Sequence, residues 1–314
     1  MTNNPYISFV ITTRNDNYGG NSLHRMQTSV NSLLTLCDKE SLNTELIIVE
    51  WNPPSDTPRL AEVLSLPKTP EVRFIEVPNE IHKKLPNSEK ISIFEYIAKN
   101  VGVRRARGEY VLVTNPDIIF STELIRYLAL KTLSPECFYR IDRHDVEEVV
   151  PLDKSIEEQL EFCAENWVKV CTIRGDMKRT RHLLDYRSVR AIIGWLRNGV
   201  VNYSLSGIHT NASGDFLLMH RKHWHKLHGY PELPTYAHID SYMCFMAVSA
   251  GLLQITLRGK KRIYHQGHIR SANALPKTNL EILLNRAKRM IKLQQPLILN
   301  DEKWGLGDEN LPPA

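Results

Sequence analysis

The chain has 314 residues, of which 42% are hydrophobic and 24% are charged, and its formal net charge is +5. This is an ordinary soluble globular composition, long enough for one large or two small domains. The five cysteines, an odd number without a C-x-x-C pair, indicate neither a disulfide framework nor a zinc knuckle. The small positive excess is compatible with anionic small molecules, a membrane surface or nucleic acid, and does not decide among them.

The ends and the apolar stretches of the chain bear on its location. The N-terminus reads MTNNPYISFV, with no basic region ahead of an apolar one, and the stretch SYMCFMAVSAGLLQITL is interrupted by Ser, Gly, Gln and Thr. We therefore expect no signal peptide and no membrane-spanning helix. With the unpaired cysteines, this pattern predicts a cytoplasmic protein.

The first third of the chain alternates strand-like and helix-like patterns. Strands are predicted at YISFVITT, ELIIVE, VRFIEV and EYVLVT, and helices at a segment capped by Ser22, around 57–66 and from about 90 to 106. Such alternation is typical of βαβ units around a mostly parallel sheet. Ligands of open sheets bind beyond the carboxyl ends of the strands, so the polar residues of TTRND, EWNPP and TNPD should converge on one crevice.

After residue 121 the pattern is less regular. Ser155 and Glu158 form a capping box that predicts a helix to about residue 170. DFLLMH predicts a strand, RKHWHKLHG a short helix ended by Gly229, and IDSYMCFMAVSAG a helix ended by Gly251. The basic segment 172–201 is either a solvated helix face or a loop that covers an anionic ligand. It has few aromatic residues and no recognisable nucleic-acid module, so we expect no nucleic-acid partner.

A second capping box, Thr278 with Glu281, predicts a helix near the C-terminus. Its leucines recur on one face, and Arg286, Lys288 and Arg289 lie on the other. A basic amphipathic helix can lie on an anionic membrane, but most such helices pack on their own domain. Peripheral membrane contact therefore stays open beside internal packing.

Asn115, Pro116 and Asp117 directly follow the fourth predicted strand. An oxygen-rich pair separated by one residue can hold Mg²⁺ or Mn²⁺ while substrate phosphates fill the other coordination positions. Alone, N-P-D is also a common turn. Upstream lie Asn100 and a cluster of arginines that could meet phosphates with planar, multidentate donors, namely Arg104, Arg105 and Arg107.

Five segments carry a resemblance to a known family. NVGVRRARGEYVLVTNPD resembles the stretch N-x-G-x-x-x-A-x-G-E-Y-(apolar)-D-x-D of glycosyltransferases with the GT-A fold, particularly the large inverting family 2, whose rhamnosyltransferase-like members often have N-P-D. ISFVITTRND and ELIIVEWNPPSD are similar to the first two strands of the family. SGDFLLMHRKHWHKLHGYPELPTYAHIDSYMCFMAVSAG and IYHQGHIRS are similar to its acceptor-side and late histidine segments. Order and approximate spacing agree over residues 6–271.

The resemblance implies an α/β, Rossmann-like GT-A fold. This fold has a mostly parallel central sheet flanked by helices, with an acceptor-side extension and a C-terminal helix. Residues 1–130 would form the nucleotide-sugar-binding half, 131–275 the acceptor-binding half of the same domain, and 276–314 a C-terminal amphipathic helix and tail.

The implied activity is metal-dependent transfer of a sugar, with inversion, from a UDP, dTDP or GDP sugar to a hydroxyl of a glycan or glycolipid acceptor. The alternative is a catalytically silent GT-A module that binds nucleotide sugars or glycans. Asn115 and Ile239 favour this alternative, because they are neutral where the family has acids.

The resemblance also implies roles for individual residues. Asp117 is the expected ligand of Mn²⁺ or Mg²⁺, Asn115 a weaker or water-mediated one, and His265 a further ligand of the metal or the diphosphate. Asp240 matches the second residue of the family's E-D pair, and Asp215 is the other candidate. One of them would be the base that takes the proton of the attacking hydroxyl. As it precedes SYMCFM, Asp240 is equally placed to cap a helix.

The remaining expected contacts are with the nucleotide. They involve Thr12, Thr13, Arg14, Asn15, Glu50, Trp51, Asn100, Arg104 and Asn115. Glu50 could accept from a base N–H or a ribose hydroxyl and Trp51 could stack, although capping or turn roles are nearly as common. His268 would face the diphosphate with His265. A denser histidine group has spacings that do not suit zinc and is expected on the acceptor-side surface, at His220, His223, His225 and His228.

Overall fold

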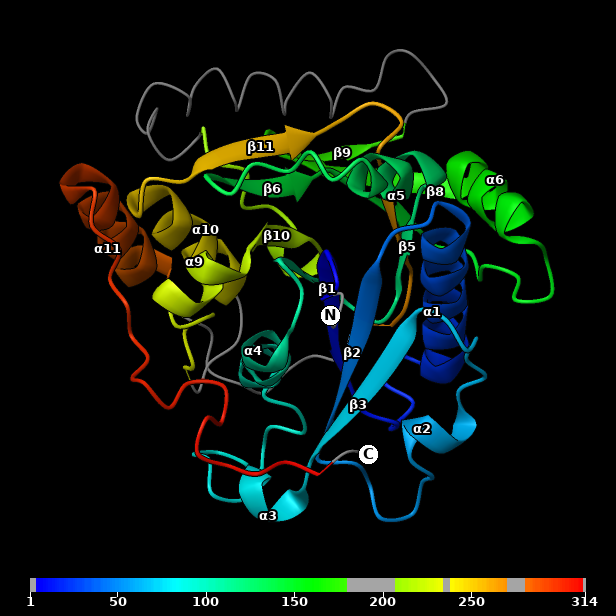
Figure 1. Ribbon diagram of the computed structural model, residues 1–314, viewed down its shortest axis with the longest axis horizontal. Coiled ribbons are helices and arrows are strands. Elements are labelled where there is room, and N and C mark those ends of the chain that lie inside the picture. The colour runs from blue at the N-terminus through cyan, green and yellow to red at the C-terminus, as the bar shows by residue number, and fades with distance from the viewer. Residues whose placement is uncertain (1–3, 180–206, 234–237, 270–279, 313–314) are drawn as a thin grey trace.

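The computed structural model describes residues 4–179, 207–233, 238–269 and 280–312 (Figure 1). Within these ranges, seven strands form one sheet in the order β11-β6-β10-β4-β1-β2-β3, and five form a second in the order β5-β12-β7-β8-β9. Most pairs of the larger sheet are parallel, and helices flank it. The predicted α/β fold class is confirmed.

The first part of the chain forms the parallel half of the central sheet. Its strands are β1 (Ile7–Thr13), β2 (Thr44–Trp51), β3 (Glu71–Val77) and β4 (Tyr110–Val113), and its helices are α1 (Ser22–Lys39), α2 (Leu60–Val63), α3 (Asn79–His82) and α4 (Glu95–Arg105). All four predicted strands are present. Ser22 is the first residue of α1 rather than its cap, which is Asn21. The helix predicted at 57–66 is the single turn α2, which ends at Val63 before an extended Leu64.

Two apolar layers cover this sheet. Because side chains alternate along a strand, Phe9 and Ile11 of β1 pack with α1, and Val10 packs with α4 on the opposite face. Gly102 lets α4 approach, since a β-carbon at this position would collide with the side chain of Val10. The small residue that the sequence places in this helix is therefore required for close packing.

The next part of the chain extends the central sheet beyond β4. The added strands are β6 (Cys137–Ile141), β10 (Leu217–His220) and β11 (Leu253–Leu257). β10 runs antiparallel to β4, and Leu217 lies opposite Val113. The residues just before β10 therefore lie beside those just after β4, which brings Asp215 next to Asn115.

The second sheet begins where β4 ends. It consists of β5 (Ile118–Phe120), β7 (Arg143–Val146), β8 (Trp167–Thr172), β9 (Gly175–Lys178) and β12 (Ile263–Gln266). The strand β12 lies between β5 and β7, so that His265 is opposite Ile118 on one side and Asp145 on the other. Residues 114–117 thus lie at the junction of the two sheets.

Helices complete the described structure. They are α5 (Thr122–Ala129), α6 (Ile156–Asn166), α9 (Arg221–Lys226), α10 (Ile239–Ser249) and α11 (Leu280–Leu293), with the short turn η1 (Ser213–Asp215). The capping box of Ser155 and Glu158 is present. Its helix, however, ends at Asn166 rather than near 170, because the chain from Trp167 pairs with β7. Thr278 and residues 180–201 of the basic segment lie outside the described residues.

The C-terminal region packs on the domain. α11 lies against α10 and buries Leu283, Ala287 and Met290. The chain then passes beside α4 toward β3, as the red segment of Figure 1 shows, and the backbone N–H of Glu76 donates to the carbonyl of Pro312. No helix in the described part of the chain is long and apolar enough to cross a membrane.

Candidate functional site

A cluster of possible metal ligands lies at the junction of the two sheets. Asp117, His265 and His268 place their donor atoms within 4.8 Å of one another, and the described residues contain no other such group of three. Oδ2 of Asp117 is 3.6 Å from Nε2 of His265 and 3.5 Å from Nε2 of His268. The backbone positions Asp117, because its carbonyl accepts from the N–H of Gln266 on β12.

The residues of the cluster fit a divalent cation. Asp117 is buried, and its Oδ1 has no hydrogen-bond partner among the described residues. Burying such an oxygen costs about 1–3 kcal/mol unless something binds it. A carboxylate with two imidazoles suits Mn²⁺ better than Mg²⁺, which prefers oxygen ligands.

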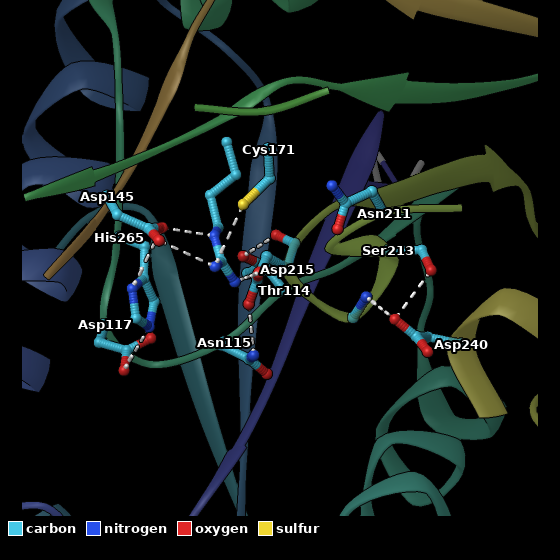
Figure 2. Close-up of polar contacts among 12 residues, drawn as sticks. Thr114, Asn115, Asp117, Asp145, Cys171, Asn211, Ser213, Asp215, Asp240 and His265 are labelled. Carbon is cyan, nitrogen blue, oxygen red and sulfur yellow. Dashed lines mark hydrogen bonds and ion pairs between the residues drawn. The ribbon is translucent and has the colours of Figure 1, made fainter. Parts of the chain in front are cut away.

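Asn115 turns away from this cluster. Its side-chain Nδ2 donates to Oδ1 of Asp215 at 2.6 Å (Figure 2). Of the three residues expected at the metal, the structure brings Asp117 and His265 together, adds His268, and directs the amide of Asn115 to a neighbouring carboxylate.

Asp215 is held by charge on its other side. Nη1 of Arg143 lies 2.5 Å from its Oδ2, and both residues are buried. Burial alone would raise the pKa of Asp215, but the positive charges of Arg143, His265 and Lys99 outweigh it and the pKa is lowered. A carboxylate held ionised in this way is a weak base.

Asp240 lies in a different environment. Its Oδ2 accepts from the hydroxyl of Ser213 at 2.8 Å and from the backbone N–H of Gly214 at 2.8 Å. The carboxylate is partly exposed, and the helix α10 is capped by His238 rather than by Asp240. Figure 2 shows Asp240 and Ser213 to one side of Asp215, and Asp117 with His265 to the other.

The turn η1, which contains Asp215, lies between Asp240 and the cluster of Asp117 (Figure 2). Lys99 anchors this turn. Its side chain is fully buried and donates to the carbonyl of Gly214 at 3.0 Å and to Glu95 at 2.6 Å. On the cluster side, the hydroxyl of Thr114 donates to the backbone carbonyl of Asp215 at 2.7 Å. The structure thus fixes a possible base on one side of η1 and a possible metal site on the other.

The loops after β1 and β2 contact each other. Nε of Arg14 donates to the carbonyl of Asn52 at 2.7 Å, and the amide of Asn15 donates to the carbonyl of Pro58 at 2.9 Å. Thr12 is buried and donates to the carbonyl of Val49, and Thr13 is the last residue of β1.

The two expected contacts on β2 are internal. Glu50 is buried, accepts from the backbone N–H of Leu60 at 3.0 Å, and has its pKa raised by burial. Trp51 is fully buried, and its Nε1 donates to Nδ1 of His82 at 2.9 Å. In this conformation Trp51 offers no face on which a base could stack.

Asn100 and Arg104 contact the C-terminal half of the chain instead of the cluster. Asn100 donates to the carbonyl of Tyr230 and to Glu232, each at 2.8 Å, and its own oxygen accepts from the N–H of Tyr230. Arg104 donates to the carbonyl of Trp304 at 3.1 Å and lies over its ring.

The other two arginines of this segment also bind protein. Arg105 donates to the backbone carbonyls of Gly305, Leu306 and Glu309. Arg107 pairs with Glu45 and Glu71. In the histidine group near α9, His223 contacts the carbonyl of Pro135 and His228 that of Asn300. The donor atoms of this group, all of whose members are described, do not come close enough together for three of them to share a metal ion.

Sequence reasoning missed Arg143, Asp145 and Lys169, which lie behind the cluster. Nε of Arg143 is 2.7 Å from Oδ1 of Asp145, and Nζ of Lys169 is 2.9 Å from its Oδ2. The available signal was the alternation of opposite charges in RHDV, which places Arg143 and Asp145 on one face of a strand.

Comparisons with known proteins are sparse. No protein-family model matches the chain, and no curated protein matches it. Among solved structures, the chain is similar to the crystal structure of GalNAc-T7 with UDP, GalNAc and Mn²⁺, at a TM-score of 0.45 and 12% identity, covering 87% of this chain and 45% of that one. The chain therefore spans less than half the length of that protein, and a likeness at this level defines neither activity nor substrate.

Proposed function

We propose that the protein is a metal-dependent glycosyltransferase of the GT-A type, which moves a sugar from a nucleoside-diphosphate sugar to a hydroxyl of a glycan or glycolipid. The observation that carries this proposal is the cluster of Asp117, His265 and His268, with its unpaired buried oxygen, beyond the carboxyl end of β4. In open, mostly parallel sheets this edge is where ligands bind.

The cluster and the reaction fit chemically. Breaking a sugar–diphosphate bond builds negative charge on the leaving nucleotide, and a divalent ion bound by Asp117, His265 and His268 would neutralise it without a proton. The histidines favour Mn²⁺ over Mg²⁺. Arg14 and Asn15 already fix the loops after β1 and β2, where the nucleotide would lie.

We assign the role of base to Asp240 rather than to Asp215. The charge of Arg143 keeps Asp215 ionised, and Asp215 already accepts a hydrogen bond from Asn115. It therefore has little tendency to take a proton. Asp240 is oriented by two neutral donors on one oxygen, and the other oxygen remains for the hydroxyl of the acceptor. A base that activates the acceptor hydroxyl on the face of the sugar opposite the leaving nucleotide gives inversion at the anomeric carbon.

Calorimetric titration tests the metal role. UDP, dTDP and GDP are titrated into the protein with MnCl₂, with MgCl₂, and with excess chelator. We expect binding to require the metal and to be tighter with Mn²⁺, and Asp117→Asn to weaken it more than about 100-fold, since even outer residues of metal sites contribute 10–100-fold. Equal nucleotide affinity in chelator would refute the metal role of Asp117.

Turnover tests the assignment of the base. Asp240→Asn should lower kcat by about 10²–10⁴-fold, the usual contribution of a general base, and leave nucleotide affinity unchanged. Retained turnover would move the base to Asp215 or elsewhere. The anomeric configuration of the product, read by NMR, separates inversion from retention.

One observation favours the silent GT-A module as a second candidate. Position 239, where the resembled family has an acid, is a buried Ile in this chain. Asp240 therefore has no acidic residue directly before it. Tight nucleotide binding, without hydrolysis or transfer across a panel of donors and acceptors, would support this reading.

A further inference from the structure

A circuit of polar and charged side chains includes two residues of the metal cluster and extends behind it. Each member contacts the next, and the circuit closes because its last residue is two positions from its first; in order it comprises Asp117, His265, Asp145, Arg143, Asp215 and Asn115. All of the charged members are buried. Figure 2 shows Asp145 on the far side of His265 from Asp117.

The two ring nitrogens of His265 face two different carboxylates. Nε2 is 3.6 Å from Oδ2 of Asp117, and Nδ1 is 3.6 Å from Oδ1 of Asp145. This follows from the sheet, since β12 lies between β5 and β7 with His265 opposite Asp145. Both distances exceed a hydrogen bond, and a ring rotation that shortens the second by roughly 0.5 Å makes it one.

Asp145 has an oxygen available for this contact. Its Oδ1 is buried and accepts no well-aligned hydrogen bond from the described residues, although Nε of Arg143 is 2.7 Å away. Arg143 and Lys169 hold the carboxylate in place, and they balance its charge. This oxygen is therefore held 3.6 Å from Nδ1 of His265 and has a lone pair left to accept from it.

His268 shows the same arrangement with a different acceptor. Its Nε2 is 3.5 Å from Oδ2 of Asp117, and its Nδ1 is 3.1 Å from the carbonyl oxygen of Ile269. Each histidine of the cluster thus directs Nε2 to Asp117 and Nδ1 to an oxygen acceptor.

We propose that Asp145 is a positioning residue, which accepts the proton of Nδ1 and so fixes His265 in the tautomer whose Nε2 is free to bind a divalent cation. The inference rests on the proposed metal-dependent function. Metal-binding histidines almost always donate their other ring N–H to a carboxylate or carbonyl, and these partners fix tautomer and ring orientation.

The test compares Asp145 with a second aspartate three residues earlier in the chain. Asp145→Asn removes the proposed partner of His265. Asp142→Asn is the matched control, because Asp142 also pairs with a histidine, His209, at 2.8 Å, and that histidine is not in the cluster. Titration with MnCl₂ alone should give about 10–100-fold weaker binding for Asp145→Asn and an unchanged affinity for Asp142→Asn.

The tautomer of His265 provides a readout that loss of charge alone would not move. In ¹⁵N spectra of the metal-free proteins near pH 8, His265 of the wild type should carry its proton on Nδ1, and Asp145→Asn should shift population to the Nε2–H form. Weaker Mn²⁺ binding with an unchanged tautomer would overturn the inference, as would unchanged Mn²⁺ binding.

Two further results distinguish a failure of the inference from a failure of the proposed function. If Asp145→Asn does not fold, because Arg143 and Lys169 lose their partner, the wild-type spectrum decides, and a proton on Nε2 of His265 overturns the inference. If the wild type binds no Mn²⁺, the metal-dependent function itself fails, and the inference fails with it.

Discussion

Two polar regions of the core, each of which contains residues from the stretch 100–117, differ in what their polar atoms contact. One is the metal cluster of Asp117, His265 and His268. The other, which we call the tail clamp, consists of Asn100, Arg104, Glu232 and Trp304. In the clamp, Asn100 and Glu232 bind each other and the backbone of Tyr230 and Gly305. In the cluster, Oδ1 of Asp117 has no partner within the described chain.

The difference separates a structural site from one that can bind a ligand. Every hydrogen bond of Asn100 goes to protein, and Gly229 has a positive φ of 66° and no room for a β-carbon beside Asn100. The clamp therefore orders the C-terminal segment against α4. In the cluster, the protein does not satisfy every polar atom in this way, and the ligand atoms lie close enough together to bind one cation. Substitutions should consequently change stability in the clamp and metal binding in the cluster.

The largest effect on stability is expected next to the cluster, at Asp215. Asp215→Asn removes one of the two carboxylates that pair with the buried Arg143 and leaves Asp145 as the other, and breaking a buried pair costs up to about 3–5 kcal/mol in the free energy of unfolding. Urea denaturation measures the loss. Asp240→Asn is the control, since its partners Ser213 and Gly214 are neutral. Equal losses in the two variants would contradict the ion-pair account.

The loss at Asp215 should also depend on pH. The pKa of Asp215 is lowered in the folded state, so its carboxylate stabilises the protein above the unfolded pKa, and this contribution disappears as pH falls through the folded pKa. The difference between wild type and Asp215→Asn should therefore shrink in acid.

Asn115→Asp tests why this chain has N-P-D where the resembled family commonly has D-x-D. The amide of Asn115 donates to Asp215 at 2.6 Å, so a carboxylate at position 115 would face a second carboxylate. Loss of a hydrogen bond to a charged group costs about 1.5–3 kcal/mol. We expect this loss of stability with no gain in Mn²⁺ affinity. Tighter Mn²⁺ binding by a stable variant would show that position 115 faces the metal.

Coupling between the two positions sharpens this result. In the double variant Asn115→Asp with Asp215→Asn, the repulsion is removed, so the combined loss of stability should be smaller than the sum of the single losses. Additive losses would mean that the two side chains do not interact.

Asn100→Ala tests whether the tail clamp acts on stability and not on metal binding. The substitution leaves the buried backbone N–H of Tyr230 without its partner, at a cost of about 1–3 kcal/mol. Titration with MnCl₂ should give the wild-type affinity, because Asn100 contacts no member of the cluster in the described structure. A loss of metal affinity without a loss of stability would return Asn100 to the ligand site.

The parallel half of the fold is predictable because its signals are local. β1, β2 and β4 are runs of apolar residues buried on both faces. The strand β7 of the second sheet gives no such signal. β7 reads RHDV, and its charged side chains are buried because Arg143 and Lys169 balance the charges of Asp145 and Asp215 across β7, β8 and η1.

The cluster was partly predictable for the same reason. Asp117 follows a local pattern, and His265 was expected through the family resemblance. That the amide of Asn115 faces Asp215, and that His268 completes the group, depends on the pairing of β5 with β12 and of β4 with β10. These pairings join segments far apart in the chain, and no local pattern reports them.

The smallest effect is expected at Glu232 in the clamp. Burial raises the pKa of Glu232, and the hydrogen bonds from Asn100 and Gly305 lower it without outweighing burial. A raised pKa means that the folded state holds the proton more tightly than the unfolded state does. The stability gained from protonated Glu232 is therefore complete below the unfolded pKa of about 4.3 and is lost as pH rises through the folded pKa.

Glu232→Gln removes this titration and keeps an oxygen that can accept from Asn100 and Gly305. The variant should match the wild type in acid and become the more stable protein as pH rises, by about 1 kcal/mol or less, the size of a single hydrogen bond. Denaturation of both proteins from pH 4 to pH 8 measures the difference. A difference that instead widens toward acid would mean that Glu232 is held ionised, as Asp215 is, and the clamp would then resemble the charged circuit behind the cluster.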